Sequence, residues 1–112
     1  MPEVIKIGNY AFSGCENLVL SELPAGIKEI GNWAFSTCRK IGITEIPETV
    51  EKIGSYVFYN ANLPMLTLKG TPTEIGKGAF SGVSTLNVPW AEGDVAGAPW
   101  GATTVNYNYT GA

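Results

Sequence analysis

The sequence predicts a repeat solenoid, because one phrase returns along the chain at a nearly constant period. The phrase is Ile-Gly-x-x-Ala-Phe, with Val in place of Ala in its third copy, and its copies begin 23, 23 and 22 residues apart. Such a period is typical of a chain that winds into coils, each of which buries its apolar face only against its neighbours. The four copies begin at Ile7, Ile30, Ile53 and Ile75.

Composition agrees with a small globular repeat protein. The chain has 112 residues and is 45% hydrophobic, which predicts one modest core rather than disorder. Its net charge is −3, with seven basic residues scattered among acids, so nucleic acid is not an expected partner. No apolar run approaches the roughly 18 residues that a membrane span needs. We therefore expect no membrane insertion.

The chain divides into a solenoid over residues 1–88 and a C-terminal cap over residues 89–112. After the solenoid come two turn-rich stretches containing Trp90 and Trp100, and then residues 103–109, whose apolar residues alternate as in a short strand. We expect the two tryptophans to fold over the last coil, on Phe80, Val83 and Leu86. At the other end the chain enters the repeat at Val4 and Ile5 without a polar block, so we expect either a truncated N-terminal side or a bare end that pairs with another surface.

Positions outside the phrase recur as well. A small apolar residue lies three positions after each Phe, and an apolar residue or Pro lies three positions after that. Leu23-Pro24 also returns one repeat later as Ile46-Pro47. The first set is Cys15, Cys38, Ala61 and Val83, and the second is Leu18, Ile41, Pro64 and Leu86. Over roughly residues 3–89 this pattern resembles the BspA-like, Treponema-type class of leucine-rich repeats. The resemblance implies a right-handed coil of about four repeats and a role in adhesion.

Each coil is expected to contain two short extended pieces and one helical turn. Alternating apolar residues predict strands at 18–23, 42–46 and 64–68. Shorter extended pieces at 6–7, 29–30, 52–53 and 74–75 each end at a Gly, which opens a helical turn through Ala-Phe. The Phe residues would fill the coil centres. In the third coil, Lys69-Gly70-Thr71-Pro72 replaces part of the pattern and predicts a local bend.

Stacking of coils at about 4.8 Å turns equivalent positions into columns. One charged column alternates in sign, and two further opposite-charge pairs join Lys28 to Glu51 and Glu16 to Arg39, which is typical of a solvated ladder that fixes register. Glu22 above Glu45 is a like-charge exception; the two side chains diverge into water, or a cation or basic partner lies between them. The alternating column is Lys6, Glu29, Lys52 and Glu74.

Two surfaces are candidate binding sites. The position before Ala-Phe carries Tyr10, Trp33 and Tyr56, then Gly78. These aromatic residues either form a strip that binds sugar rings or protein side chains, or lie flat over the turns and shield the core. The second surface is the strand face, whose small and acidic residues suit a basic protein ligand. That face comprises Ser21, Glu22, Thr44, Glu45 and Thr67.

The sequence favours no catalytic, cofactor or metal site. The chain has no His, which excludes a Ser-His or Cys-His relay and an imidazole metal site, and no glycine-rich loop matches a phosphate-binding pattern. Cys15 and Cys38, one period apart, are expected to be buried structural thiols; a disulfide and a metal or redox site are the alternatives. We therefore expect a protein that is not an enzyme.

Three functions remain open at this point. The first is an adhesion or protein-binding module of a bacterial cell-surface or secreted protein, which the resemblance implies. The second is a rigid structural or receptor-binding tip of a phage tail protein, located in the virion. The third is a carbohydrate-binding module that uses the aromatic residues. A protein ligand is the preferred partner, and a glycan is the alternative.

Overall fold

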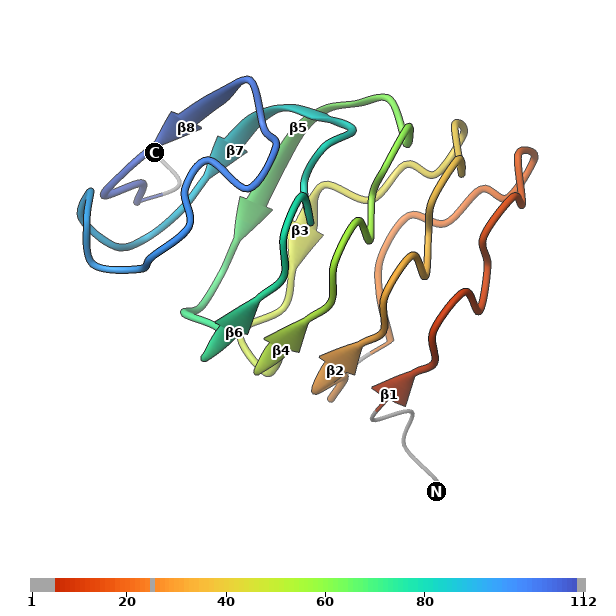
Figure 1. Ribbon diagram of the computed structural model, residues 1–112, viewed down its shortest axis with the longest axis horizontal. Helices are drawn as coiled ribbons and strands as arrows, with labels where there is room; N and C mark the ends of the chain where they lie inside the picture. Colours follow the sequence, from red (N-terminus) through yellow and green to blue (C-terminus); the bar gives the residue numbers. More distant parts are fainter. Residues whose placement is uncertain (1–5, 25, 111–112) are drawn as a thin grey trace.

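The computed structural model describes residues 6–24 and 26–110, which wind into a stack of coils (Figure 1). Within these residues the regular structure consists of short strands joined by turns and bends, and the strands form two parallel sheets. We number the coils by the strand of the first sheet with which each begins. The expectation about the N-terminal end at Val4 and Ile5 concerns residues outside the described ranges.

The first sheet has one two-residue strand per coil, in the order β1-β2-β4-β6. In every strand a charged residue that points outward precedes an Ile that points to the core. This Ile is buried in the first three strands and half-buried in β6. The register pairs equivalent positions of successive coils, as the repeat period predicts. The strands are β1 (Lys6–Ile7), β2 (Glu29–Ile30), β4 (Lys52–Ile53) and β6 (Glu74–Ile75).

The second sheet has the order β3-β5-β7-β8. Its strands are β3 (Glu45–Ile46), β5 (Leu63–Leu68), β7 (Val83–Asn87) and β8 (Thr104–Asn106). The strand expected at 18–23 is absent, because no neighbouring strand pairs with this segment in the described structure, and the one expected at 42–46 is reduced to its last two residues. The expected bend lies at Lys69 and Gly70.

The helical turns expected after each Gly are a wrong prediction: the described residues contain no helix, and this segment is a run of tight turns. In the first coil, Ala11 and Ser13 donate backbone N–H groups to the carbonyls three residues earlier, at 3.2 and 3.1 Å. The residues between them donate to the next coil instead: Tyr10 to the Asn32 carbonyl and Phe12 to the Ala34 carbonyl, at 2.9 and 2.8 Å. Alternate amides thus close turns and join coils, so the backbone is satisfied without a helix.

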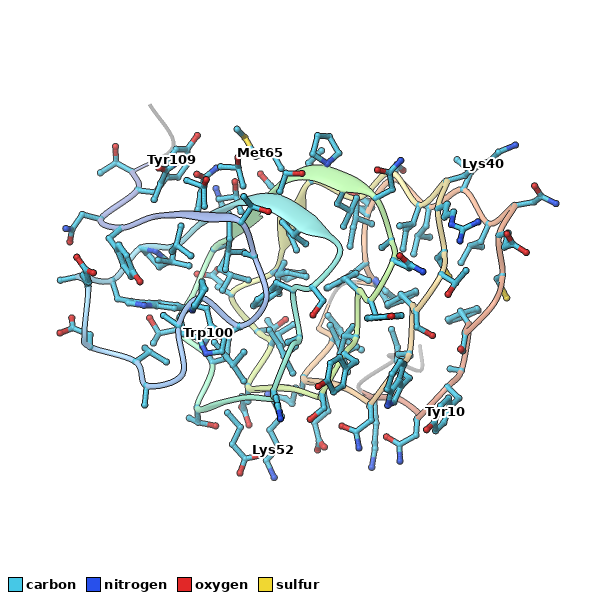
Figure 2. All side chains as sticks on the ribbon, turned by 45° about the horizontal axis from the view of Figure 1, so that its top comes forward. Tyr10, Lys40, Lys52, Met65, Trp100 and Tyr109 are labelled. Carbon is cyan, nitrogen blue, oxygen red and sulfur yellow. The ribbon has the colours of Figure 1, made fainter. Side chains whose placement is uncertain are left out.

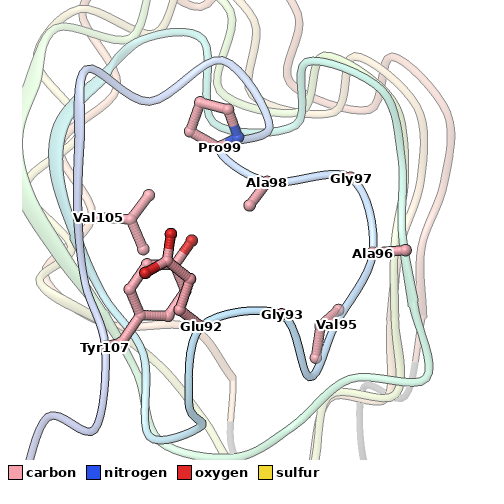
Figure 3. A pocket seen from close by; sticks show the side chains of 9 residues that line it. All are labelled: Glu92, Gly93, Val95, Ala96, Gly97, Ala98, Pro99, Val105 and Tyr107. Carbon is pink, nitrogen blue, oxygen red and sulfur yellow. The ribbon is translucent and has the colours of Figure 1, made fainter.

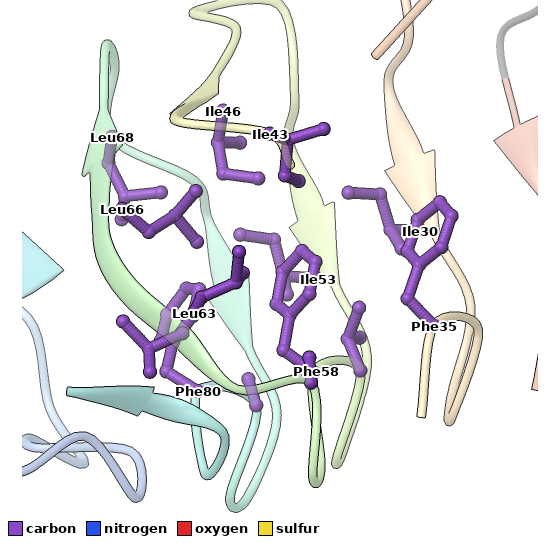
Figure 4. Packing of buried hydrophobic residues seen from close by; sticks show 14 of the residues in the cluster. Ile30, Phe35, Ile43, Ile46, Ile53, Phe58, Leu63, Leu66, Leu68 and Phe80 are labelled. Atoms are coloured by element: carbon purple, nitrogen blue, oxygen red, sulfur yellow. The ribbon is translucent and has the colours of Figure 1, made fainter. Parts of the chain in front are cut away.

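The core of the stack is a column of parallel phenylalanine rings, with Ile, Leu and Val packed beside it (Figure 4). Phe35 and Phe58 lie 5.8 Å apart between centroids and 6° from parallel, and Phe80 follows at 6.1 Å. These three rings are fully buried, as expected. Phe12, the first ring of this phenylalanine column, stacks 5.4 Å above Phe35 but remains 38% exposed, because only one of its faces is covered by a neighbouring ring.

Glycine is required in the Ile-Gly step because the coils approach each other closely there. A Cβ on Gly31, Gly54 or Gly76 would lie within 2.4 to 2.6 Å of a backbone amide nitrogen of the preceding coil. The side chain of Asn32 strengthens the same contact, because its Oδ1 accepts the N–H of Ser55 at 2.8 Å, just as Asn9 accepts the N–H of Asn32. The Gly thus sets the spacing of the coils.

The C-terminal segment packs on the last coil through Trp100. Trp100 packs edge-on against Phe80, with centroids 6.4 Å apart, and Trp90 packs edge-on against Trp100 at 5.8 Å. Both tryptophans are buried: Trp90 is 6% exposed and Trp100 is 3% exposed. The indole N–H of Trp100 donates to the Ala96 carbonyl at 3.1 Å. Two large rings therefore shield the last phenylalanine from water.

Candidate functional site

The tyrosine and tryptophan residues before Ala-Phe form a continuous stack along one side of the solenoid. We call Tyr10, Trp33 and Tyr56 the aromatic strip. Tyr10 and Trp33 are 3° from parallel with centroids 6.3 Å apart, and Trp33 and Tyr56 are 23° from parallel at 4.8 Å. Tyr59, which sequence reasoning missed, packs edge-on against both Trp33 and Tyr56, at 5.4 and 6.1 Å. The four rings thus form one cluster.

The backbone beneath the strip adopts an unusual conformation. Tyr10, Trp33 and Tyr56 have φ angles of 60°, 59° and 55°, in the left-handed region that bulky side chains rarely occupy. Gly78 has the equivalent position in the fourth coil, with a φ of 65°. Glycine fits this conformation without strain, whereas another residue there costs on the order of 1–3 kcal/mol. Three aromatic residues therefore stand where the backbone would favour Gly.

The strip remains accessible although its rings cover each other. Tyr10 is 61% exposed and Tyr59 is 42% exposed, while Trp33 and Tyr56 are half-buried. Because neighbouring rings stack face to face, the ring faces of Trp33 and Tyr56 are largely occupied within the strip. What the surface presents is ring edges with polar groups, a combination of apolar area and hydrogen-bonding capacity that is enriched at protein interfaces.

The alternative expectation, that these aromatic residues lie flat over the turns and shield the core, fits only the C-terminal end of the strip. A Cβ on Gly78 would lie 2.5 Å from a ring carbon of Tyr56, so this ring rests on the backbone of the fourth coil. Tyr10, in contrast, is the most exposed member. The strip therefore covers backbone at one end and projects into solvent at the other.

The second candidate surface, the strand face, is less continuous than the sequence suggested. Ser21, Glu22, Thr44 and Glu45 are exposed, but the first two lie outside any strand. Glu45 pairs in register with Thr67 of the next coil. Its carboxylate lies 3.8 Å from the Lys69 ammonium. This ion pair gives Glu45 a positive neighbour, so Glu45 needs no bound cation between it and Glu22.

Thr67 is committed to a ladder of polar side chains. Its hydroxyl accepts a hydrogen bond from the Asn87 amide at 3.1 Å, and Asn87 in turn accepts one from Asn106 at 2.8 Å. Asn87 is fully buried, so this ladder satisfies its polar atoms and fixes the register of the sheet. Met65, 49% exposed, is the large apolar residue on this face. Figure 2 shows Met65 and Tyr10 at opposite sides of the molecule, so the two candidate surfaces are separate.

The charged columns are stacked as predicted, but only some of them form ion pairs. Lys28 and Glu51 approach to 3.5 Å, and Arg39 and Glu16 to 3.2 Å, as expected. The alternating column that begins at Lys6 has the predicted register, yet none of its four members forms an ion pair within 4.0 Å with another described residue. Exposed pairs of this kind contribute at most about 1 kcal/mol. They support register and identify no ligand.

The two cysteines differ in exposure, which corrects the expectation that both are buried. Both are free thiols; Cys38 is buried and Cys15 is exposed. Cys38 belongs to the second coil, whereas Cys15 belongs to the first, where the neighbouring coil covers one side only. Burial raises the pKa of the Cys38 thiol above its ordinary value. The Cys38 thiol donates to the Phe12 carbonyl at 3.0 Å.

An open hollow lies at the C-terminal end, where the loop of residues 92–99 curves around a space bordered on its other side by Val105 and Tyr107 (Figure 3). Its one ionisable carboxylate is that of Glu92, and most of its other lining residues are small and apolar. Such a set lacks the paired acid and base or the nucleophile that catalysis requires. Across the described ranges, no three His, Cys, Asp or Glu residues gather as a metal site would need.

Comparison with known proteins identifies the repeat. A family model described as BspA type leucine rich repeat region matches residues 1–92 in six copies. Comparisons with curated proteins and with solved structures find no match. In the part of the chain that the structure describes, no helix has the length and apolar character that crossing a membrane requires.

Proposed function

Because the chain belongs to the BspA-type leucine-rich repeat family, whose repeats serve as protein-interaction modules, we propose that it is an adhesion module that binds a protein ligand through the aromatic strip and Tyr59. The repeat family is typically non-enzymatic, and the proposed role needs no catalytic residue. The proposed location is the surface of a bacterial cell or its secreted fraction, as part of a parent protein. A phage virion is the alternative location.

The observation that carries this proposal is the exposed aromatic cluster on a strained backbone. Each of its three strip residues costs conformational energy that Gly would avoid, and stacking of about 0.5–1.5 kcal/mol per ring pair opposes that cost. Residues held in such conformations concentrate at functional sites. Tyrosine and tryptophan are also the residues that dominate the energetics of protein interfaces.

A protein ligand fits the geometry better than a glycan. Sugar rings stack on the open faces of aromatic rings, but here Trp33 stacks at 4.8 Å on Tyr56 and contacts Tyr59 edge-on. Tyr10 has one stacked neighbour, and Tyr59 has only edge-on neighbours. These two separate rings offer a glycan chain no continuous row of open faces, whereas a row of ring edges with hydroxyl groups suits a polar and apolar protein surface.

The proposal is tested by NMR titration of the tryptophan indole N–H signals. A mucin-type glycan is added first, and extracellular matrix proteins are added afterwards. Trp33 reports on the strip, while Trp90 and Trp100 are buried at the C-terminal end and serve as internal references. We expect no change with the glycan, and broadening of the Trp33 signal with a matrix protein. A Trp33 shift with the glycan would instead make the strip a carbohydrate site.

Two variants locate the interface. Tyr10→Ala removes the most exposed strip residue, and Met65→Ala removes a comparably exposed apolar side chain on the opposite side. We expect Tyr10→Ala to weaken matrix-protein binding at least tenfold and Met65→Ala to leave it unchanged. The reverse result would move the interface to the strand face, where Glu22 and Glu45 would make binding sensitive to added salt.

A further inference from the structure

The two cysteines occupy the same position of consecutive coils, and only one of them is shielded from solvent. Cys15 and Cys38 are 23 residues apart, the period of the first two repeats. Cys38 has no exposed surface, whereas Cys15 is exposed. An exposed thiol directly above a buried one is the arrangement in which a first sulfur reacts with an external oxidant and a second sulfur completes the reaction.

The backbones of the two coils are in contact at this position. Two residues before each cysteine, the hydroxyl oxygens of Ser13 and Ser36 lie 2.6 Å apart. The N–H of Gly14 donates to the Ser36 carbonyl at 2.9 Å. Equivalent side chains of the first and second coils therefore touch, and stacked chains of this kind separate equivalent Cα atoms by about 4.8 Å, within the range that a disulfide bridges.

The buried thiol is directed toward the first coil. The Cys38 Sγ donates to the Phe12 carbonyl at 3.0 Å, and the same carbonyl accepts the N–H of Cys15, also at 3.0 Å. The Cys38 sulfur thus lies against the turn that carries Cys15. A bond between the two sulfurs would join turns that already share a hydrogen-bond acceptor.

We propose that Cys15 and Cys38 are a thiol pair that a small-molecule disulfide oxidises to an inter-coil disulfide. The Cys15 thiolate attacks the small disulfide, forms a mixed disulfide and releases one small thiolate. The Cys38 sulfur, after losing its proton to solvent, attacks the Cys15 sulfur and releases the second small thiolate. Two protein thiols are oxidised to one disulfide, and one small disulfide is reduced to two thiols.

The order of the two steps follows from the difference in environment. Cys15 is exposed to solvent, and Cys38 is buried. Burial also raises the pKa of the Cys38 thiol, which keeps it protonated and slows its reaction with reagents from solution. Once Cys15 carries the mixed disulfide, the reacting sulfur is held beside Cys38, so the second step is intramolecular.

The experiment is oxidation of the folded, reduced protein with oxidised glutathione, followed by intact-mass and peptide mass spectrometry. We expect the wild-type protein to lose two hydrogen atoms, to form no disulfide between molecules and to yield a peptide pair joined through Cys15 and Cys38. Cys38→Ala should instead retain glutathione on Cys15. Cys15→Ala should remain unmodified while it is folded. The wild-type peptide map decides the question even if a variant does not fold.

Three outcomes would overturn the proposal. One is a glutathione adduct that persists on wild-type Cys15, the second is a dimer joined through Cys15, and the third is a protein with two free thiols after oxidation.

A second readout is hydrogen exchange at the Gly14 and Cys15 amides. These amides should exchange more slowly in the oxidised protein, since the new bond ties the first coil to the second. Reduction with excess thiol should restore the original exchange rates. The result is independent of which partner the aromatic strip binds.

Discussion

The phenylalanine column and the aromatic strip are two stacks of rings built by the same repeat, one inside the solenoid and one on its surface. In both, one ring per coil lies nearly parallel to the next, for example Phe12 on Phe35 at 5° and Tyr10 on Trp33 at 3°. Phe35 is fully buried, whereas Tyr10 is 61% exposed. The comparison teaches that the repeat period sets the register of the rings in both stacks. A stack whose side chains point inward stabilises the fold, whereas a stack whose side chains point outward is available to a ligand.

The largest expected effect separates the two stacks by stability. Phe35→Ala should lower the free energy of unfolding by about 3–5 kcal/mol, because it removes a fully buried aromatic ring from the middle of the column. Tyr10→Ala, at the exposed end of the strip, should lower it by less than about 1 kcal/mol. Chemical denaturation of both variants measures the difference. A loss below about 1 kcal/mol for Phe35→Ala would contradict its place in the core.

A second prediction concerns the spacing that both stacks share. Gly54→Ala would place a Cβ 2.6 Å from the Asn32 amide nitrogen, so the coils must separate or tilt. We expect a loss of about 1–3 kcal/mol by thermal or chemical unfolding, as for other overpacked sites. Gly8→Ala is the matched control, because nothing lies within 4 Å of the added Cβ. Equal losses in the two variants would mean that contact between coils is not the cause.

A third prediction tests the outer stack alone. Tyr56→Gly relieves the backbone strain of a tyrosine in the left-handed region, but it also removes the ring contacts with Trp33 and Tyr59. Because strain relief and lost stacking are each on the order of 1 kcal/mol, the free energy of unfolding should change by about 1 kcal/mol or less. Matrix-protein binding should nevertheless fall. A large destabilisation with unchanged binding would assign the strip to the fold instead of to recognition.

The smallest expected effect comes from the surface ion pairs. Arg39→Ala removes the pair with Glu16 and should lower the free energy of unfolding by less than about 1 kcal/mol, since both side chains are exposed. Moderate salt should reduce the difference between this variant and the wild type. A loss that equals that of Gly54→Ala would show that charge, rather than backbone contact, holds the coils together.

The period allowed much of the fold to be predicted. It placed Ile7, Ile30 and Ile53 in register and put Phe35 and Phe58 in one buried column, because a chain that repeats its apolar pattern can bury it only by stacking. The same period placed the three strip residues side by side.

The local conformation was harder to predict, since Gly followed by Ala-Phe suits a helical turn and a run of tight turns equally well. One signal was present: Gly78 takes the position that aromatic residues have in the other coils, which indicates a backbone that glycine favours. Tyr59 could also have been found, because it stands where Ser13, Ser36 and Ser81 stand in the other coils. The exposure of Cys15 depends on what covers the first coil, and no local pattern encodes that.

The offsets between paired strands have a consequence for how the chain tolerates insertions and deletions. Partners are 23 residues apart at Ile7 and Ile30, 22 at Glu45 and Thr67, 20 at Leu63 and Val83 and 19 at Leu86 and Val105. The number of residues between paired positions therefore falls toward the C-terminus while the hydrogen-bonded register is kept. The change in length is absorbed in the connections between paired segments. Evolution or a protein engineer can thus add or remove single residues in those connections, whereas a change within a paired segment must span a whole coil.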